Sequence, residues 1–175
     1  RIGVYKSGRQ KKILCLAKDN KGLILAGTED GIILLDPKTH KNIKIEDYAL
    51  PIAILNQKRV ICLNFDSKGN LYAGTINGLF KINKRGFEQY DNEKTGDHKL
   101  PENIITSLFE DAQENMWVGT IDGLCKINSV GNVENTIFFA ERLKNLHSNA
   151  EFKTNRNYYS LINNYGGNTI RIIYE

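Results

Sequence analysis

The sequence contains little proline, cysteine, methionine or tryptophan, and it has no long apolar run. Its 175 residues include 3 Pro, 3 Cys, 1 Met and 1 Trp, beside 15 Gly. This composition excludes collagen-like and proline-rich disordered chains, and a hydrophobic share of 41% is sufficient for a packed core. No segment approaches the ~18 apolar residues expected of a membrane helix. Because the chain begins at Arg1 without a signal peptide or an initiator methionine, we expect a piece processed from a longer protein.

The three cysteines form no recognisable metal or disulfide pattern. Cys15, Cys62 and Cys125 lie far apart, with no Cys-x-x-Cys pair and no Cys/His spacing typical of zinc. Small buried cysteines in strands are the simpler interpretation. We therefore expect no metal and no cofactor. A domain of this size needs no disulfides even in an oxidising compartment.

The net charge of +4 does not by itself predict nucleic-acid binding. Lysines are scattered through turns and strands, and the densest polar run, positions 9–12, is short. A nucleic-acid site concentrates basic residues on one element and interleaves them with aromatic residues. We expect no direct contact between this segment and nucleic acid.

One pattern occurs three times along the chain: Asp, seven residues, Gly-Thr, two residues, Gly. The copies are Asp19–Gly31, Asp66–Gly78 and Asp111–Gly123. Successive copies begin roughly 45 residues apart, a period typical of four-stranded propeller blades rather than of helical or leucine-rich repeats. Each copy is therefore expected to be one folding unit.

Each copy predicts three antiparallel strands. A β-branched or aromatic segment precedes the Asp, a second apolar segment runs into Gly-Thr, and a third follows the last Gly. The expected strands are 13–17, 24–26 and 32–35, then 60–65, 71–73 and 79–82, then 105–109, 116–118 and 124–127.

The turns between these strands carry the expected turn residues. The Asp is predicted to cap the first turn by accepting backbone N–H groups. The third copy lacks the turn glycine and shifts its turn-tolerant residue to Asn115, which suggests a different turn geometry there. The pairs Asp30-Gly31, Asn77-Gly78 and Asp122-Gly123 suit the primed turns of hairpins.

A fourth, outer strand at 42–48 and at 86–90 would complete a blade, because polar residues alternate there with apolar ones. Repeated glycines have a packing explanation, since a sheet between two other blades is covered on both faces. The residues assigned to the structural repeat rather than to a ligand are Asp19, Gly27, Gly31, Asp66, Gly74, Gly78, Asp111, Trp117, Gly119 and Gly123.

These motifs resemble the two-component regulator propeller repeats. The resemblance rests on Tyr72-Ala73-Gly74-Thr75, Trp117-Val118-Gly119-Thr120 and the lead-in Leu100-Pro101-Glu102-Asn103. It covers positions 10–128 and implies an all-β fold, a partial β-propeller of about three to four four-stranded antiparallel blades. Closed propellers have four to eight blades. The remaining blades of the same chain are therefore expected partners, with a homodimer as another candidate.

The predicted organisation is one propeller segment over 1–175. Positions 1–8 would end a preceding blade, 9–50 and 51–95 would be blades, and 96–169 would be a blade with an insertion at 130–169. Ile170–Glu175 resembles Ile105–Glu110 and would be the first strand of a further blade.

The unrepeated insertion is the candidate ligand site, since loops carry specificity while repeats carry the scaffold. Its aromatic faces and multivalent hydrogen-bonding groups could bind a sugar. The candidate residues are Arg156, Tyr158, Tyr159, Asn163, Asn164 and Tyr165. The alternative is structural, with a short surface helix at 141–146 and an outer strand at 158–161.

No catalytic constellation is recognisable in the sequence. His40, His98 and His147 lie at unrelated repeat offsets, with no nucleophile elbow, phosphate loop or metal motif. The repeated aspartates are explained by their turns. We assign no catalytic residue and do not expect this segment to be an enzyme.

The resemblance implies a function as well as a fold. Similar proteins are extracytoplasmic sensor regions of membrane-anchored hybrid two-component systems, so the segment is expected on the periplasmic or extracellular face. Its ligand would be a glycan-derived oligosaccharide or another small molecule, and a histidine kinase elsewhere in the protein would transmit the signal and control transcription. Two alternatives stay open: an extracellular propeller enzyme, such as a lyase or a glycan-active hydrolase, and a protein-interaction scaffold.

Overall fold

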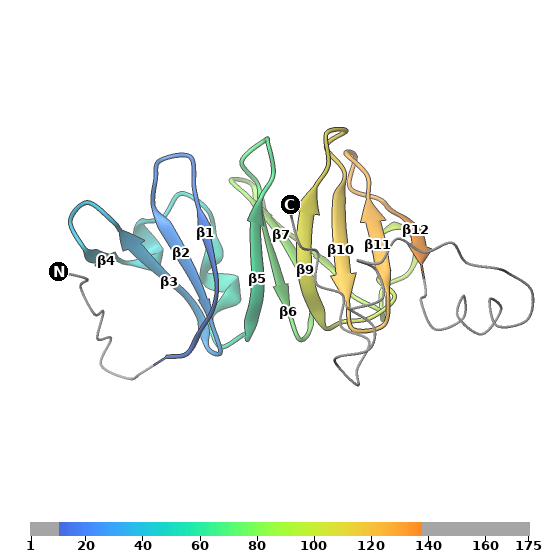
Figure 1. Ribbon diagram of the computed structural model, residues 1–175, viewed down its shortest axis with the longest axis horizontal. Coiled ribbons are helices and arrows are strands. Elements are labelled where there is room, and N and C mark those ends of the chain that lie inside the picture. Colours follow the sequence, from blue (N-terminus) through green and yellow to red (C-terminus); the bar gives the residue numbers. More distant parts are fainter. Residues whose placement is uncertain (1–10, 138–175) are drawn as a thin grey trace, which may run out of the picture.

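Residues 11–137 are described by the computed structural model, and their strands form three antiparallel sheets of four strands each. In chain order the strands are β1 (Ile13–Lys18), β2 (Ile24–Thr28), β3 (Gly31–Asp36), β4 (Lys41–Ile43), β5 (Val60–Phe65), β6 (Leu71–Thr75), β7 (Gly78–Asn83), β8 (Gly86–Tyr90), β9 (Ile105–Glu110), β10 (Met116–Thr120), β11 (Leu124–Ile127) and β12 (Val133–Ile137). Each sheet uses four consecutive strands. The sheets, called blades 1, 2 and 3, stand side by side (Figure 1), which confirms the predicted all-β propeller segment.

The first turn of every blade is organised by the predicted aspartate. Asp19 Oδ1 accepts the backbone N–H groups of Lys21 at 2.9 Å and Leu23 at 2.8 Å. Asp66 and Asp111 accept the two corresponding N–H groups of their own turns. A carboxylate that takes two such bonds fixes the hairpin, so these acids serve the turns as predicted.

The third of these turns keeps the geometry of the other two, contrary to the prediction. Glu114 takes a φ of 62° at the position where Gly22 and Gly69 have φ of 88° and 80°. The backbone bond from Glu114 N–H to Asp111 O matches the bond from Gly69 N–H to Asp66 O. The carboxylate and the strand pairing therefore hold the turn in shape even without glycine.

The second hairpin of each blade is not the primed turn that the sequence suggested. A type I′ turn needs positive φ at both central residues, but only Gly31 and Gly78, which close the loops, have positive φ, of 104° and 102°. Thr28 Oγ1 instead accepts the N–H of Asp30 and donates to Gly31 O. In blades 1 and 2 the threonine of the Gly-Thr pair thus stabilises a loop with one residue of positive φ, and Thr120 makes the same two bonds in blade 3.

The outer strands differ from the prediction in two blades. In blade 1 the strand ends at Ile43 and is followed by the 3-10 helices η1 (Ile45–Asp47) and η2 (Ile52–Leu55), so the expected strand 42–48 is largely helical turn. η3 (Gly96–His98) lies in the next connection. In blade 3 the outer strand is β12, which lies inside the stretch interpreted as an insertion from position 130. β12 also fills the place that the structural alternative gave to 158–161.

Neighbouring blades pack through two apolar clusters. Leu25 and Leu34 of blade 1 meet Leu71 and Phe80 of blade 2 in the first cluster, and Tyr72 and Leu79 meet Met116 and Val118 in the second. The small repeat residues Cys15 and Cys62 also pack against these clusters. Burial of this kind is the main stabilising term of an all-β repeat.

The repeated glycines lie where the next blade approaches the sheet. A Cβ added at Gly27 would lie 2.9 Å from Val60 Cγ1, and one at Gly74 would lie 2.7 Å from Ile105 Cγ2. Cys15 and Cys62 pack at the same points, with Sγ 3.8 Å and 4.0 Å from the carbonyl oxygens of Val60 and Ile105. Burial raises the pKa of the Cys15 thiol to about 11, as expected of an unreactive structural cysteine.

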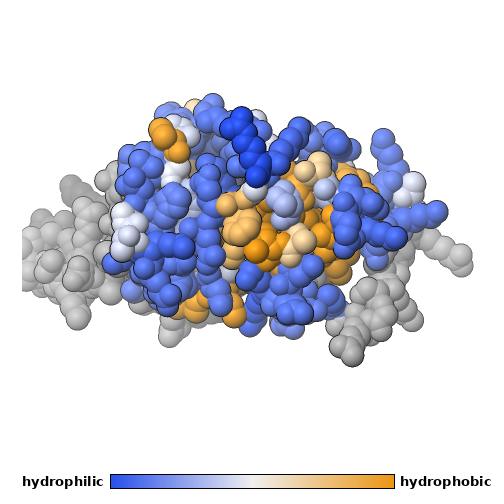
Figure 2. All heavy atoms as spheres, turned by 180° about the vertical axis from the view of Figure 1, so that it is seen from behind, coloured by the Kyte–Doolittle hydropathy of each residue, from blue (hydrophilic) through white to orange (hydrophobic). Residues whose placement is uncertain are grey.

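The face of blade 1 that points away from blade 2 is open. On blade 1, Leu16 is 65% exposed, although its counterparts Leu63 and Leu108 pack against a preceding blade. Seen from behind, an apolar patch lies near the middle of the molecule (Figure 2). Among residues 11–137 no helix is long and apolar enough to cross a bilayer.

Candidate functional site

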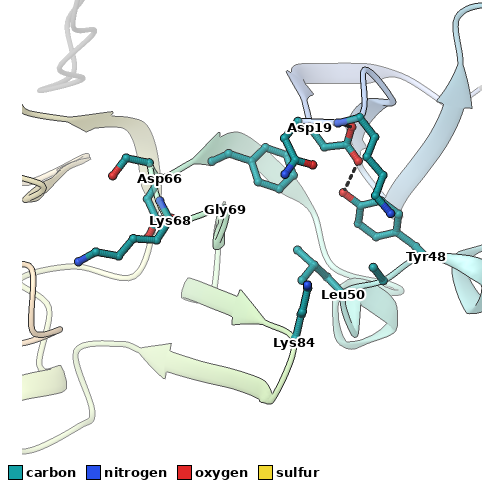
Figure 3. Close-up of a pocket in the computed structure, with 12 residues that line it drawn as sticks. Asp19, Tyr48, Leu50, Asp66, Lys68, Gly69 and Lys84 are labelled. Atoms are coloured by element: carbon teal, nitrogen blue, oxygen red, sulfur yellow. Dashed lines mark hydrogen bonds between the residues drawn. The ribbon is translucent and has the colours of Figure 1, made fainter.

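A cleft of about 280 Å³ opens between blades 1 and 2. Three segments far apart in the sequence line it: the β1–β2 turn at 19–21, the connection at 48–50 and the β5–β6 turn at 65–69, with Lys84 from the β7–β8 turn. Figure 3 shows Asp19 and Tyr48 on one side, the turn with Asp66, Lys68 and Gly69 on the other, and Leu50 and Lys84 between them. Ligands often bind in clefts between structural units.

Tyr48 is held in this cleft by a buried carboxylate. Its hydroxyl donates to Asp19 Oδ2 at 3.0 Å, and Asp19 is only 6% exposed. Burial and the neighbouring Asp19 raise the pKa of the Tyr48 hydroxyl well above its ordinary value. The ring is therefore fixed in position and stays a neutral donor at physiological pH.

The lining combines two aromatic rings with a polar rim. Tyr48 and Phe65 are partly exposed, Leu50 is buried, and Lys21 and Lys84 are exposed at the edge. A second hollow of about 380 Å³ shares Leu50 and Lys84 and adds Asn70, Asn83 and Arg85. Aromatic faces bordered by hydrogen-bonding groups suit a ligand with one apolar face and several hydroxyl or anionic groups.

Several polar side chains of the lining are already engaged with partners in the protein. Asp66 Oδ1 and Oδ2 already accept from its own turn, including Asn70 Nδ2 at 2.7 Å. Ser67 donates through N and Oγ to Glu110 at 2.7 Å and 2.9 Å, and Lys68 pairs with Glu114 at 2.8 Å. Within positions 11–137 no three His, Cys, Asp or Glu side chains gather to hold a metal ion.

None of the ligand residues predicted from the sequence is among the residues that line this cleft. Arg156, Tyr158, Tyr159, Asn163, Asn164 and Tyr165 lie outside the described residues. His40 lies in the β3–β4 turn and His98 ends η3, and neither lines the cleft. The Tyr48–Asp19 pair was missed, since the strands β2, β3 and β4 lie between the two residues in the sequence and no local motif links them.

Comparison with known proteins agrees with the repeat found in the sequence. Residues 99–122 match the family model of the two component regulator propeller, which confirms the predicted resemblance at that position. No curated protein matches the chain. The remaining comparisons are with solved structures. Because each is less than 25% identical to this chain, the likeness shows a shared fold and nothing further.

Two of these structures are extracellular domains from B. thetaiotaomicron. One protein, assigned to the hybrid two component systems, is 19% identical with a TM-score of 0.60, covering 81% of this chain and 19% of that one. Another of the same assignment is 18% identical with a TM-score of 0.52, covering 79% and 24%.

A third structure is an enzyme. It is a catalytically inactive virginiamycin B lyase from Staphylococcus aureus with quinupristin, 14% identical with a TM-score of 0.53, covering 75% of this chain and 43% of the lyase. The chain thus spans less than half of each of these proteins.

Proposed function

We propose that this chain is a ligand-sensing propeller segment of the extracytoplasmic region of a two-component sensor, and that its ligand is a glycan-derived oligosaccharide. The observation that carries the proposal is the two-component regulator propeller repeat at 99–122, set in a fold shared with extracellular domains of such systems. The glycan is supported by the chemistry of the cleft, where Tyr48 and Phe65 lie among lysines and turn amides.

Signalling would follow from a shift between conformations. A ligand that binds one relative arrangement of propeller and neighbouring domains more tightly stabilises that arrangement by the difference in binding free energy. The cleft between blades 1 and 2 is formed by segments of both blades. A ligand there would therefore respond to their relative position.

The alternative that the segment is an enzyme is supported only by the similarity of its fold to that of a lyase. The lyase has the same fold as this chain, but propellers host many unrelated functions, so function must be argued from a site. In the described part of the chain, the cleft contains the turn-bound carboxylate of Asp66 and Lys68, which is paired with Glu114. We therefore favour binding over catalysis.

An oligosaccharide panel tests the proposal and locates the site. Binding would be measured by calorimetry on the whole 175-residue chain, then repeated on Lys84→Ala in the cleft and on Arg156→Ala and Tyr158→Ala in the C-terminal stretch. Lys38→Ala, an exposed lysine of the β3–β4 turn, is the control. Weakening by Lys84→Ala alone assigns the cleft, and weakening by the other two assigns the C-terminal stretch. Absence of binding across neutral, acidic and sulfated oligosaccharides would refute glycan sensing by this segment.

A further inference from the structure

The face of blade 3 that points away from blade 2 contains a buried hydroxyl without a hydrogen-bond partner. Met116 and Val118 pack toward blade 2, so Trp117 and Gly119, which alternate with them along β10, lie on the opposite face. Ser107 Oγ packs over Gly119 on that face, buried and unpaired. Buried polar groups normally have a partner, so this hydroxyl needs an explanation.

In blades 1 and 2, the equivalent face is covered by the first strand of the next blade. Cys15 and Cys62 stand where Ser107 stands, and each directs its Sγ at the carbonyl of the first residue of the next blade, Val60 or Ile105. The side chains of those two residues also pack on the glycines that correspond to Gly119. The third face lacks this occupant among the described residues.

A second contact helps to fix the register of the junction between blades 2 and 3. Glu110, at the last position of β9, accepts both the N–H and the hydroxyl of Ser67 in the first turn of blade 2, at 2.7 Å and 2.9 Å. The matching position in the first turn of blade 3 is Ala112, which is exposed. A next strand in the same register would thus place a residue near Ala112 N–H.

We infer that Ile170–Glu175 is the segment that docks on this face, as the first strand of a fourth blade. Its sequence Ile-Arg-Ile-Ile-Tyr-Glu aligns with Ile105–Glu110 without a gap. In this register Ser107 Oγ donates to the carbonyl oxygen of Ile170, the Ile170 side chain packs on Gly119, and the Glu175 carboxylate accepts the N–H of Ala112.

The length of the chain permits this docking. The connection from one blade to the next runs from position 43 to 60 and from position 90 to 105. The chain from position 137, where β12 ends, to position 170 is about twice as long. A connection twice as long closes at little extra entropic cost, because the cost grows only with the logarithm of loop length.

Tryptophan fluorescence tests the docking directly, because Trp117 is the only tryptophan and lies on the face in question. Ile170→Asn should red-shift the emission and raise acrylamide quenching. The matched control is Arg171→Asn, whose side chain points to the other side of the same strand. The expected result is a change for Ile170→Asn and none for Arg171→Asn, with far-ultraviolet circular dichroism unchanged in both. No change in either variant would overturn the inference.

A disulfide test fixes the register and excludes a second copy as the occupant. In a background with Cys15→Ser, Cys62→Ser and Cys125→Ala, the pair Ser107→Cys and Ile170→Cys should form an intramolecular disulfide under mild oxidation. Ser107→Cys with Arg171→Cys should not, because its Cβ atoms face apart. Equal linking of the two pairs, no linking of either, or a disulfide-linked dimer would each overturn the inference.

Discussion

At the scale of single residues, the repeat reuses one carboxylate but gives it a different additional partner in each blade. Asp19 accepts the Tyr48 hydroxyl, Asp66 accepts Asn70 Nδ2, and Asp111 accepts both Asn115 Nδ2 and the indole N–H of Trp117 at 2.8 Å. The backbone bonds of the turn use one oxygen, so the other is available. In blade 1 the second oxygen, Asp19 Oδ2, holds the Tyr48 ring in the cleft, so a residue of the scaffold also positions a residue of the candidate site.

Gly74→Ala should destabilise the chain more than Gly69→Ala. A Cβ at Gly74 would lie 2.8 Å from Ile105 Cβ, whereas a Cβ at Gly69 meets nothing within 4 Å and only has a strained φ of 80°. Overpacking of this kind costs about 1–3 kcal/mol, against roughly 1–2 kcal/mol for alanine at a positive φ. Urea unfolding of both variants measures the difference, and equal costs would mean that the blades separate easily.

The acid sensitivity of blade 3 should depend on Asp111. Burial opposes its ionisation, but hydrogen bonds from Asn115, Trp117 and Gln113 outweigh burial and lower the pKa of the carboxyl to about 2. A carboxyl with a lowered folded pKa stabilises the fold above its ordinary pKa of about 4, and this contribution disappears as the pH falls toward 2. Asp111→Asn should therefore melt below the parent at pH 7, and the gap in melting temperature should narrow by pH 3.

Asp122→Asn, at an exposed turn position of the same blade, is the control for that experiment. It should leave the melting temperature close to the parent value at both pH values. A gap for Asp111→Asn that stays constant with pH would contradict the role of the charged carboxylate.

At the scale of elements, local sequence patterns predicted the strands and the Asp turns because both depend on residues close in the chain. Glu114 escaped prediction because its left-handed conformation is imposed by the Asp111 bonds around it rather than by its own preference. β12 was missed since its residues are mostly polar. A signal was present in Asn128, whose Oδ1 accepts the N–H groups of Val130 and Asn132 just as the turn aspartates do.

The cleft could not be predicted from local patterns. Its lining comes from turns of two blades and from the connection between them, and the contact between Tyr48 and Asp19 spans 29 residues. In the sequence Tyr48 has no feature that separates it from a blade-packing tyrosine. The connection, where a strand was expected and a 3-10 helix formed, is the element that brings the ring to Asp19.

Tyr90→Phe should weaken the junction between blades 2 and 3. The Tyr90 side chain is fully buried, and its hydroxyl lies 2.9 Å from Gly131 O and 3.0 Å from Glu88 Oε2. Removal leaves a carbonyl of the β11–β12 turn without its donor, which costs about 1–3 kcal/mol. Chemical denaturation measures this loss. Tyr48→Phe, at a partly exposed ring, should cost less, and the reverse order would contradict the importance of the Tyr90 contact.

At the scale of the whole molecule, the described residues form a row of three blades whose first blade has an open face. Each blade contacts only its neighbours, so stability is approximately a sum of blade and junction contributions, and an uncovered end face loses one junction. The open face of blade 1 exposes Leu16 and partly exposes Ile24, Ile33 and Leu35. An apolar surface of this kind favours association with another surface.

We therefore expect the isolated 175-residue chain to self-associate through the open face of blade 1. Leu16→Lys should weaken this association, because burial of a leucine side chain contributes about 1.5–3 kcal/mol, which corresponds to roughly tenfold or more in the dissociation constant. Sedimentation velocity over a concentration series measures it. The control is Ile76→Lys, which makes the same change at a residue 43% exposed in the β6–β7 turn of the middle blade. If the two variants weaken association equally, net charge rather than the open face is the cause, and if the parent is monomeric at every concentration the face is covered in solution.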